Sequence, residues 1–387
     1  MTDIAPTPAR PRLRANWTAY AYLSLWAYCL YGMGNATPYL RDDLRLNGFE
    51  AGLHGSALAI GVLIAGLAAD WIARRLGRAR LLDLSVVCIC TALALIAMAP
   101  SVAVSLSGAL LLGFGGGSVG THVNLSLARA NESESRKLLS RANAWSMTTA
   151  FAAPLAIGVA AALAHAWRIA LLLPIVALVG LTLVAPREAR SAAAPRLPKT
   201  RLPASYWIVW ALLVLAVSIE FSIVFWGSSV VSRHTGISSA EATMLASLFV
   251  AGMLVGRTAI GAGFGSRLGT RTLLACGLVL VELGVALVAI SSAAPLAGLG
   301  LALSGLGTAS LWPVGLALGL NHAPRAQMAA SARATLASGL AVLVAPSALG
   351  LAGDRLGVLM AWPIILGIAA LALVVLAIIP PVERTTP

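Results

Sequence analysis

Charged residues are scarce in this chain of 387 residues, of which 11% are charged and 59% are hydrophobic. A soluble globular protein carries about 25% charged residues, so the composition argues against one. Apolar stretches close to the roughly 20 residues that a bilayer crossing needs recur along the whole chain. We therefore expect an all-α membrane protein with twelve transmembrane helices, at 17–40, 48–69, 79–99, 102–128, 138–164, 167–185, 205–231, 240–264, 271–292, 295–319, 327–352 and 358–380.

Cysteines and catalytic motifs are also scarce. The four cysteines all fall inside predicted helices, and no pair has the pattern of a disulfide or a zinc site. The glycine-rich segment 113–120 is not followed by the Lys-Ser/Thr pair of a nucleotide-binding loop, and the chain has no HExxH metalloprotease motif. These absences exclude an ATP-driven pump, and we expect no enzymatic activity, no metal site and no cofactor.

Acidic residues are half as frequent as basic ones, 14 against 27, and the formal net charge is +13. With the amino terminus inside, the inner segments hold 22 of the Lys and Arg residues and the outer loops hold five: Arg41, Arg45, Arg168, Arg233 and Arg355. This asymmetry follows the positive-inside rule. It predicts a multi-pass protein of the bacterial cytoplasmic (inner) membrane with both termini cytoplasmic, rather than a nucleic-acid-binding surface. The first 16 residues contain no apolar core or cleavage site, so we expect no removable signal peptide.

The sequence resembles itself at an offset of 192 residues, about half its length. The shift superimposes "RRLGRARLL" (74–82) on "SRLGTRTLL" (266–274), and Arg141-Ala142 on Arg333-Ala334. It also superimposes Ala153-Pro154 on Ala345-Pro346. We expect a tail at 1–16, a six-helix bundle at 17–185, a cytoplasmic linker at 186–204, a second six-helix bundle at 205–380 and a tail at 381–387.

Two parallel six-helix repeats resemble the major facilitator superfamily (MFS), whose members bind substrate near the membrane midplane between the halves. The segment "GLAADWIARRLGRARLL" (66–82) resembles the longer variant of the superfamily's signature loop, because glycine follows Asp70 by seven positions rather than three. The resemblance implies a monomer that moves a small-molecule substrate across the lipid bilayer. It also implies gating or motif roles for Gly66, Asp70, Arg75, Gly77, Arg78, Arg257, Arg267, Gly269 and Arg271.

Four further stretches resemble the fucose:proton symporter branch of that superfamily. They are "GFGGGSVGTHVNLSLA", "LLSRANAWSMTTAFAAPL", "SIEFSIVFW" and "GLGTASLWPVGLALGL". One departure concerns the coupling carboxylates, which that branch carries in its amino-terminal half. The corresponding helices here offer Asn35, His122 and Asn124 instead, and Asn143 stands where a histidine is expected.

Ionisable residues deep in the predicted helices are few, and they are candidates for proton coupling: Glu220, His122 and Glu282. An ionised carboxylate in the membrane interior costs several kcal/mol, so Glu220 can take up and release a proton as its hydration changes. A structural, hydrogen-bonded glutamate is the alternative. His122 titrates in a useful range and could relay protons to Glu220 across a cavity, or it could be a hydrogen-bond partner alone. Structural pairing is the favoured interpretation for Glu282.

The candidate substrate-binding residues are uncharged: Asn35, Asn124, Asn143, Trp145, Trp226 and Trp312. Asparagine amides suit hydroxyl recognition, and tryptophans in the middle of a span can stack on a sugar ring. Interhelical hydrogen bonding and plain packing are the respective alternatives. Glu220 and Trp226 are about 240° apart on an ideal helix, so they share a site only if the helix is unwound near 227–229. Trp17, Trp167 and Trp207 look like residues of an interfacial aromatic belt.

Together these features predict a secondary transporter that works by alternating access. Its expected cargo is a small polar organic solute, with a sugar-like one favoured, and the proton gradient is the expected energy source. A proton-driven exporter of drugs or amphipathic metabolites is the first alternative. A non-transporting membrane scaffold or sensor is the second.

Overall fold

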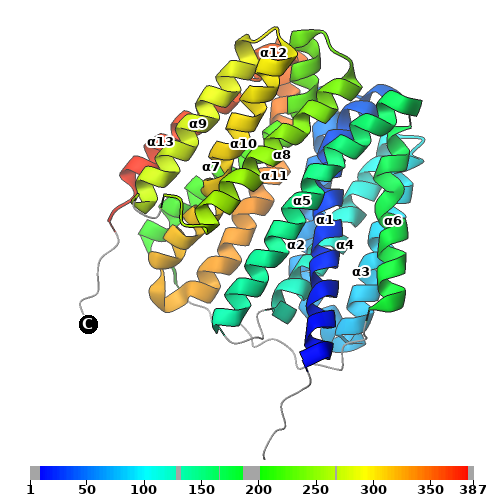
Figure 1. Cartoon of the computed structure of the whole chain (residues 1–387), viewed down its shortest axis with the longest axis vertical. Coiled ribbons are helices and arrows are strands. Elements are labelled where there is room, and N and C mark those ends of the chain that lie inside the picture. The colour runs from blue at the N-terminus through cyan, green and yellow to red at the C-terminus, as the bar shows by residue number, and fades with distance from the viewer. Residues whose placement is uncertain (1–8, 128–131, 165, 186–200, 266–267, 382–387) are drawn as a thin grey trace, which may run out of the picture.

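The computed structural model describes residues 9–127, 132–164, 166–185, 201–265 and 268–381. For some helical residues only the backbone is described, among them Asp70, Arg78 and Asn124, and Arg267 lies outside the described residues. The described chain is helical (Figure 1). Its α-helices are α1 (Ala9–Leu44), α2 (Gly48–Leu76), α3 (Arg78–Ala97), α4 (Val102–Leu127), α5 (Glu132–Ala164), α6 (Trp167–Val184), α7 (Ala204–Thr235), α8 (Ser239–Gly261), α9 (Thr270–Ile290), α10 (Ala294–Asn321), α11 (Gln327–Leu356), α12 (Val358–Ala361) and α13 (Ile364–Ile378), with a short 3₁₀ helix η1 (Pro324–Ala326) before α11.

The predicted all-α fold is confirmed, with two differences at the ends of the chain. The first helix begins at Ala9, eight residues before the predicted span. The last span, 358–378, is interrupted by a turn between α12 and α13, where Pro363 has no N–H to donate to a continuing helix. Eleven stretches in the described residues are long and apolar enough to cross a membrane, and only the more polar α1 among the long helices is not one of them.

The helices form two bundles of six spans each, α1–α6 and α7–α13, in which α12 and α13 together make one span (Figure 1). The two bundles have equivalent internal contacts. In the first, Gly113 of α4 lies against the Leu58 carbonyl of α2. In the second, Gly305 of α10 lies against the Phe249 carbonyl of α8. Gly113 and Gly305 are related by the offset of 192 residues. In both bundles a side chain at the glycine would overlap backbone atoms, so the repeated glycines allow the same close helix packing twice.

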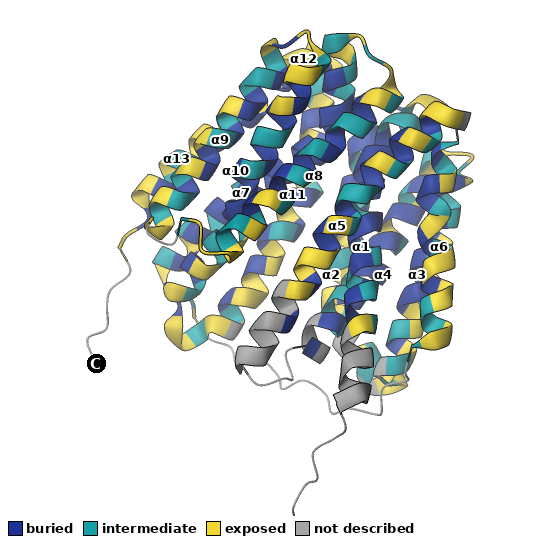
Figure 2. Ribbon diagram, in the orientation of Figure 1, coloured by how far each residue is buried: buried dark blue, intermediate teal, exposed yellow. Residues whose placement is uncertain are grey.

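Burial distinguishes the central helix from the peripheral ones (Figure 2). In the most apolar stretch of α7, 72% of the residues are buried, against 28% in α6. The exposed side chains of α6 and α13 are themselves apolar, including Val176, Leu183 and Val374. Exposed aliphatic surface of this kind is typical of a lipid-facing helix. The second half therefore places α7, which carries Glu220, at the centre of the molecule.

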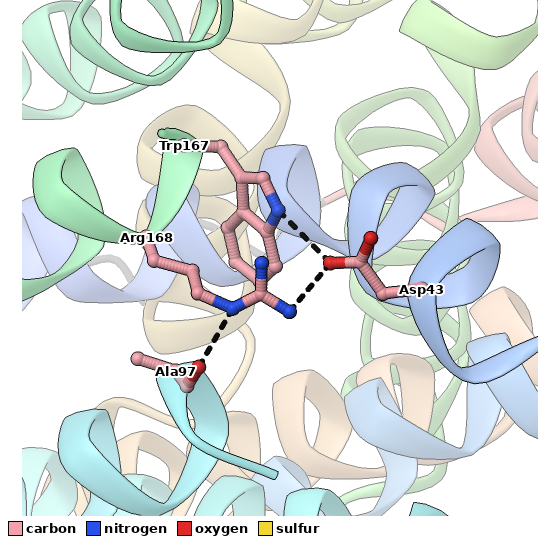
Figure 3. A network of polar contacts seen from close by, with 4 residues as sticks. All are labelled: Asp43, Ala97, Trp167 and Arg168. Carbon is pink, nitrogen blue, oxygen red and sulfur yellow. Dashed lines mark hydrogen bonds and ion pairs between the residues drawn. The ribbon is translucent and has the colours of Figure 1, made fainter. Parts of the chain in front are cut away.

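A polar network joins three helices of the first bundle at one end (Figure 3). Asp43 of α1 forms an ion pair of 2.6 Å with Arg168 of α6 and accepts a hydrogen bond of 3.1 Å from the Trp167 indole. Arg168 also donates to the carbonyl of Ala97, the last residue of α3. Trp167 is only 3% exposed and stacks on Tyr39. The interpretation of Trp167 as an interfacial belt residue was wrong, because Asp43 and Tyr39 hold its ring inside the bundle.

The two bundles contact each other at this same end, which we call the far end. It contains the α1–α2 and α7–α8 connections, and the opposite, terminal end contains the start of α1 and the end of α13. Along α2 and α11, Gly52 lies against the backbone of Ser347, and Ser56 donates a hydrogen bond of 2.5 Å to the Leu343 carbonyl. Between α5 and α8, Gly158 lies against the Ala240 carbonyl. These contacts involve small residues and backbone atoms, so the far end is tightly closed.

Contacts between the bundles fade toward the terminal end. Leu63 of α2 still lies against Gly339 of α11. One turn further on, a Cβ at Gly66 would have no described atom within 4 Å, and Leu67 is 83% exposed. On the facing stretch of α11, Leu336 is exposed. Gly261 at the end of α8 likewise has no close neighbour. The described helices of the two bundles therefore separate between the middle of the molecule and the terminal end. The molecule is closed at the far end and open at the terminal end.

Candidate functional site

The site centres on a hydrogen bond between the two bundles. The Tyr31 hydroxyl of α1 donates to Glu220 Oε1 of α7 over 2.5 Å. Both side chains are buried, at 3% and 7% exposed. The Tyr31 ring also packs beside Phe221, with ring centroids 6.4 Å apart. Glu220 thus lies at the interface of the halves, and its hydrogen bond with Tyr31 joins them.

A cation lies within electrostatic range of this pair. Arg257 of α8 acts on Tyr31 through its positive charge, and its Nη1 donates to the thioether sulfur of Met147 on α5 over 3.0 Å. A thioether is a weak acceptor. Arg257 Nε is buried and has no hydrogen-bond partner in the described structure. The site therefore combines a carboxylate, a phenol and an incompletely bonded guanidinium from helices of both bundles.

Asn35 extends the polar face of α1 by one turn from Tyr31. It is 2% exposed, and its amide nitrogen donates to the Tyr31 carbonyl over 2.9 Å, which leaves Oδ1 buried without a partner among the described atoms. Between them, Gly34 faces Val224 and Phe225 of α7 so closely that a Cβ would meet Val224 Cγ1 at 2.6 Å. Gly34 thus permits the approach of α1 to α7 that brings Tyr31 to Glu220.

The other candidates of the first bundle lie nearer the terminal end. Asn143 of α5 is exposed. One turn later in α5, Met147, which contacts Arg257 of α8, is buried. Trp145 is 48% exposed and its ring lies against Trp17, with centroids 5.5 Å apart. His122 on α4 is half-buried. The described hydrogen bond to Glu220 is donated by Tyr31, so the relay from His122 to Glu220 stays a prediction. The side chain of Asn124 lies outside the described part of the structure.

The tryptophans of the second bundle are not brought to Glu220. The helix α7 is continuous from Ala204 to Thr235, so the unwinding at 227–229 that would unite Glu220 with Trp226 does not occur. Trp226 is buried, and its indole donates to the Pro346 carbonyl of α11 over 2.9 Å. Trp312 of α10 is half-buried and packs in the apolar cluster around Leu213. In this structure Trp226 and Trp312 both contribute to packing within the second bundle.

The signature-loop residues of the two halves adopt different geometries. Gly77 ends α2 with φ = +90°, a conformation that favours glycine, whereas its repeat partner Gly269 has φ = −65°. Arg75 is exposed and lies over the Trp71 ring, 4.3 Å from its centroid. Arg271 donates to the Ile379 carbonyl after α13. Asp70 and Arg78 are outside the described side chains, so their gating role stays a prediction.

The sequence interpretation missed an ionic contact at the far end. Asp354, at the end of α11, accepts hydrogen bonds from two backbone N–H groups of α2: Gly48 at 2.6 Å and Phe49 at 2.8 Å. These N–H groups open the helix and point away from it, so a carboxylate there binds both unsatisfied donors and the positive end of the helix dipole. Asp354 is thus a cap supplied by the other bundle. In the sequence it is an acidic residue two positions after the predicted span 327–352.

Two cavities in the described structure lie away from Glu220. One of about 420 Å³ is apolar and lies between α7, α11 and α13, with Ser218 and Ser222 of α7 in its wall. Those serines are two residues either side of Glu220, which places them nearly opposite it on the helix. A second cavity, of about 220 Å³, is polar and is lined by Arg41, Arg233 and Ser228 at the far end. Among the described residues no cluster of His, Cys, Asp or Glu could hold a metal ion.

Comparison with known proteins identifies the architecture. No protein-family model and no curated protein sequence matches the chain. Among solved structures, a D323A mutant of the nucleoside transporter NupG superposes with a TM-score of 0.79 at 14% identity, covering 96% of this chain and 100% of that one. A bacterial homologue of the human lysosomal transporter Spinster, inward-facing and occupied, has a TM-score of 0.79 at 12% identity, with 97% of each chain covered. The POT-family transporter PepTSo has a TM-score of 0.74 at 16% identity, covering 97% and 98%.

At these identities the similarity establishes the fold and not the cargo. The matches extend over nearly the whole length of each chain, so both bundles and their arrangement are shared. They include a nucleoside transporter and a POT-family transporter, and they do not single out the fucose:proton symporter branch. This chain therefore shares with these solved transporter structures the fold of two pseudo-symmetric six-helix bundles.

Proposed function

We propose that the protein is a secondary active transporter that moves a small polar organic solute by alternating access, coupled to protons through Glu220. The observation that carries the proposal is the hydrogen bond from Tyr31 to Glu220, a buried carboxylate contact between the two bundles. The fold, shared with structures described as transporters, supports transport. Under the positive-inside orientation, in the inner membrane with cytoplasmic termini, this structure is open to the cytoplasm.

The proposed coupling follows from how the hydrogen bond responds to charge. When Glu220 is ionised, its contact with Tyr31 is charge-assisted and about twice as strong as a neutral one. Protonation removes that assistance and lowers the cost of exposing or reburying the carboxyl group in a low-dielectric interior. The α1–α7 contact then weakens, which favours opening of the far end. Proton binding thereby biases the same contact that has to break for the transporter to change state.

Solute class and direction are the parts to be tested in proteoliposomes. A panel of labelled sugars, polyols and sugar acids is assayed for uptake and efflux under an imposed pH gradient, and for counterflow exchange without one. We expect the wild type to concentrate one class of solute when the gradient is present. In Glu220→Gln, accumulation is expected to be lost while counterflow continues, because the neutral amide can still accept from Tyr31 but cannot carry a proton.

Glu282→Gln provides the matched control, since Glu282 is the half-buried glutamate of α9, in the same bundle. It is expected to keep both accumulation and exchange. If Glu220→Gln still concentrates the solute against its gradient, Glu220 is not the coupling site. If no gradient-driven flux of any solute occurs in either direction in the wild type, the transport proposal itself fails.

A further inference from the structure

Arg257 is a half-buried cation that has no anionic partner among the described residues. Its Nε is fully buried and unbonded in the described structure, and its only described hydrogen bond goes to the sulfur of Met147. In the described part of the chain, the one ion pair within 4 Å is Arg168–Asp43 at the far end. Burying a guanidinium costs several kcal/mol unless a counter-charge is present. The Glu220 carboxylate accepts its described hydrogen bond from the Tyr31 hydroxyl and forms no described ion pair with Arg257.

The free part of the guanidinium has the shape that a carboxylate needs. Nη1 is occupied by Met147, which leaves the edge formed by Nε and Nη2 without a described hydrogen bond. Carboxylates bind such an edge through two parallel hydrogen bonds. Arg257 as a whole is half-buried, so part of its side chain remains accessible.

Charge balance links this cation to Glu220. With the site empty, ionised Glu220 and Arg257 sum to zero. If an anion arrives without a proton, the cluster carries one excess negative charge, which is costly in the membrane interior. If the anion arrives while Glu220 takes up a proton, the sum returns to zero. The pair of residues therefore favours loading an anion and a proton together.

We propose that the cargo carries a carboxylate that binds the Nε–Nη2 edge of Arg257, and that it is loaded with one proton on Glu220, so that transport is electroneutral. This inference rests on the proposed function and narrows its cargo to small organic anions. Arg257, which the sequence placed among the gating residues, is here a substrate-binding residue. The uncharged Asn35 remains available for a hydroxyl group of the same solute.

The test uses purified full-length protein and matched probes that differ in charge. Acetate, lactate, gluconate and benzoate, each a monoanion, are paired with their neutral amides, and thermal stabilisation is measured for each pair. We expect at least one carboxylate to stabilise the wild type more than its amide does. Arg257→Gln is expected to weaken that apparent affinity by at least tenfold, and Arg257→Lys by less, because it keeps the charge but loses the planar fork. Arg325→Gln, at an exposed arginine of the same bundle, serves as the control and is expected to bind as the wild type does.

The results separate this inference from the transport proposal. If no carboxylate exceeds its amide in the wild type, or if Arg257→Gln binds the preferred carboxylate undiminished while remaining folded by gel filtration, the anion site is refuted. Arg257→Lys then decides whether a loss in Arg257→Gln was only a folding defect, since it keeps the cation in place. In proteoliposomes, gradient-driven transport of neutral solutes alone would refute the anion site and leave proton-coupled transport standing. Flux of the carboxylate that changes with an imposed membrane potential would refute electroneutral loading.

Discussion

Asp354 offers a direct test of what holds the far end closed. Its carboxylate spans the two bundles and accepts from Gly48 and Phe49 at the start of α2. Asp354→Asn keeps the size of the side chain and one acceptor oxygen, but it removes the charge. We predict that this variant opens the far end more often than the wild type does.

The magnitude follows from the two hydrogen bonds. A hydrogen bond to a charged group contributes about 1.5–3 kcal/mol, and the helix dipole adds about 0.3–1 kcal/mol at an exposed site. Asp354 is exposed, and the asparagine retains part of the interaction. The expected loss to the closed state is therefore about 1–2 kcal/mol, a factor of roughly 5–30 in the ratio of closed to open molecules.

The assay is a distance distribution between spin labels on the two bundles, measured by electron double resonance. After the four native cysteines are replaced, labels are placed at Ser101 and Ser292, exposed residues just before α4 and α10. In Asp354→Asn the ratio of the long-distance to the short-distance population is expected to rise by about that factor of 5–30. Raising the salt concentration in the wild type is expected to shift the distribution in the same direction, because the contact is exposed to screening.

Glu50→Gln is the matched control, since Glu50 accepts from the Asn47 N–H within the capping box at the same end of α2. It removes one negative charge beside the same helix terminus without touching the other bundle. We expect its distance distribution to match that of the wild type. Equal shifts in both variants would show that the charge acts on α2 alone. An unchanged distribution in Asp354→Asn would refute the idea that the cap stabilises closure.

Two further predictions concern packing and pH. In Gly52→Ala a Cβ would meet the Pro346 carbonyl at 2.6 Å and the Ser347 nitrogen at 2.7 Å, so the same spin-label assay is expected to show a smaller closed population. Gly180→Ala in α6, where a Cβ has no described atom within 4 Å, is the control and is expected to leave that population unchanged. Burial, and secondarily the charge of Arg271, lower the pKa of His322 below its ordinary value of 6.5. The unfolded chain therefore binds a proton there that the folded chain does not, and stability is expected to fall as pH drops through 6.5 toward that lowered pKa. Thermal unfolding of His322→Gln between pH 5 and 8 is expected to show a weaker pH dependence, and an identical profile would contradict this account.

The helices were predictable because the membrane imposes a simple rule on them. Each span has to be apolar over a fixed length, and that signal is local in the sequence. The burial of Glu220 followed from the same rule, since it lies in the middle of an apolar run. The offset of 192 residues predicted two bundles, and the paired contacts of Gly113 and Gly305 show why the glycines recur.

Contacts between the bundles were not predictable from the sequence. They depend on the position of each helix along the axis of the helix it packs against, and no local sequence pattern specifies that position. Nothing in the sequence near Tyr31 indicates that its hydroxyl reaches a residue 189 positions away. The same holds for Asp354, whose two partners lie about 305 positions away. Trp167 shows the opposite error: its position at the start of a span suggested the lipid interface, but Asp43 from α1 provides an acceptor that draws the indole inward.

The symmetry of the fold clarifies why the proposed site works only when the halves are together. Glu220 has Tyr28 as its repeat partner, and the Tyr28 hydroxyl bonds Ala170 within the first bundle rather than taking part in the site. The repeat partners of Tyr31 and Arg257 are Ile223 and Ala65, which are apolar. Each polar group therefore exists in one bundle alone, and neither bundle contains both the carboxylate and its phenol donor. In the proposed mechanism, a change in the protonation of Glu220 acts on the contact between the bundles, because the phenol that donates to Glu220 belongs to the other bundle.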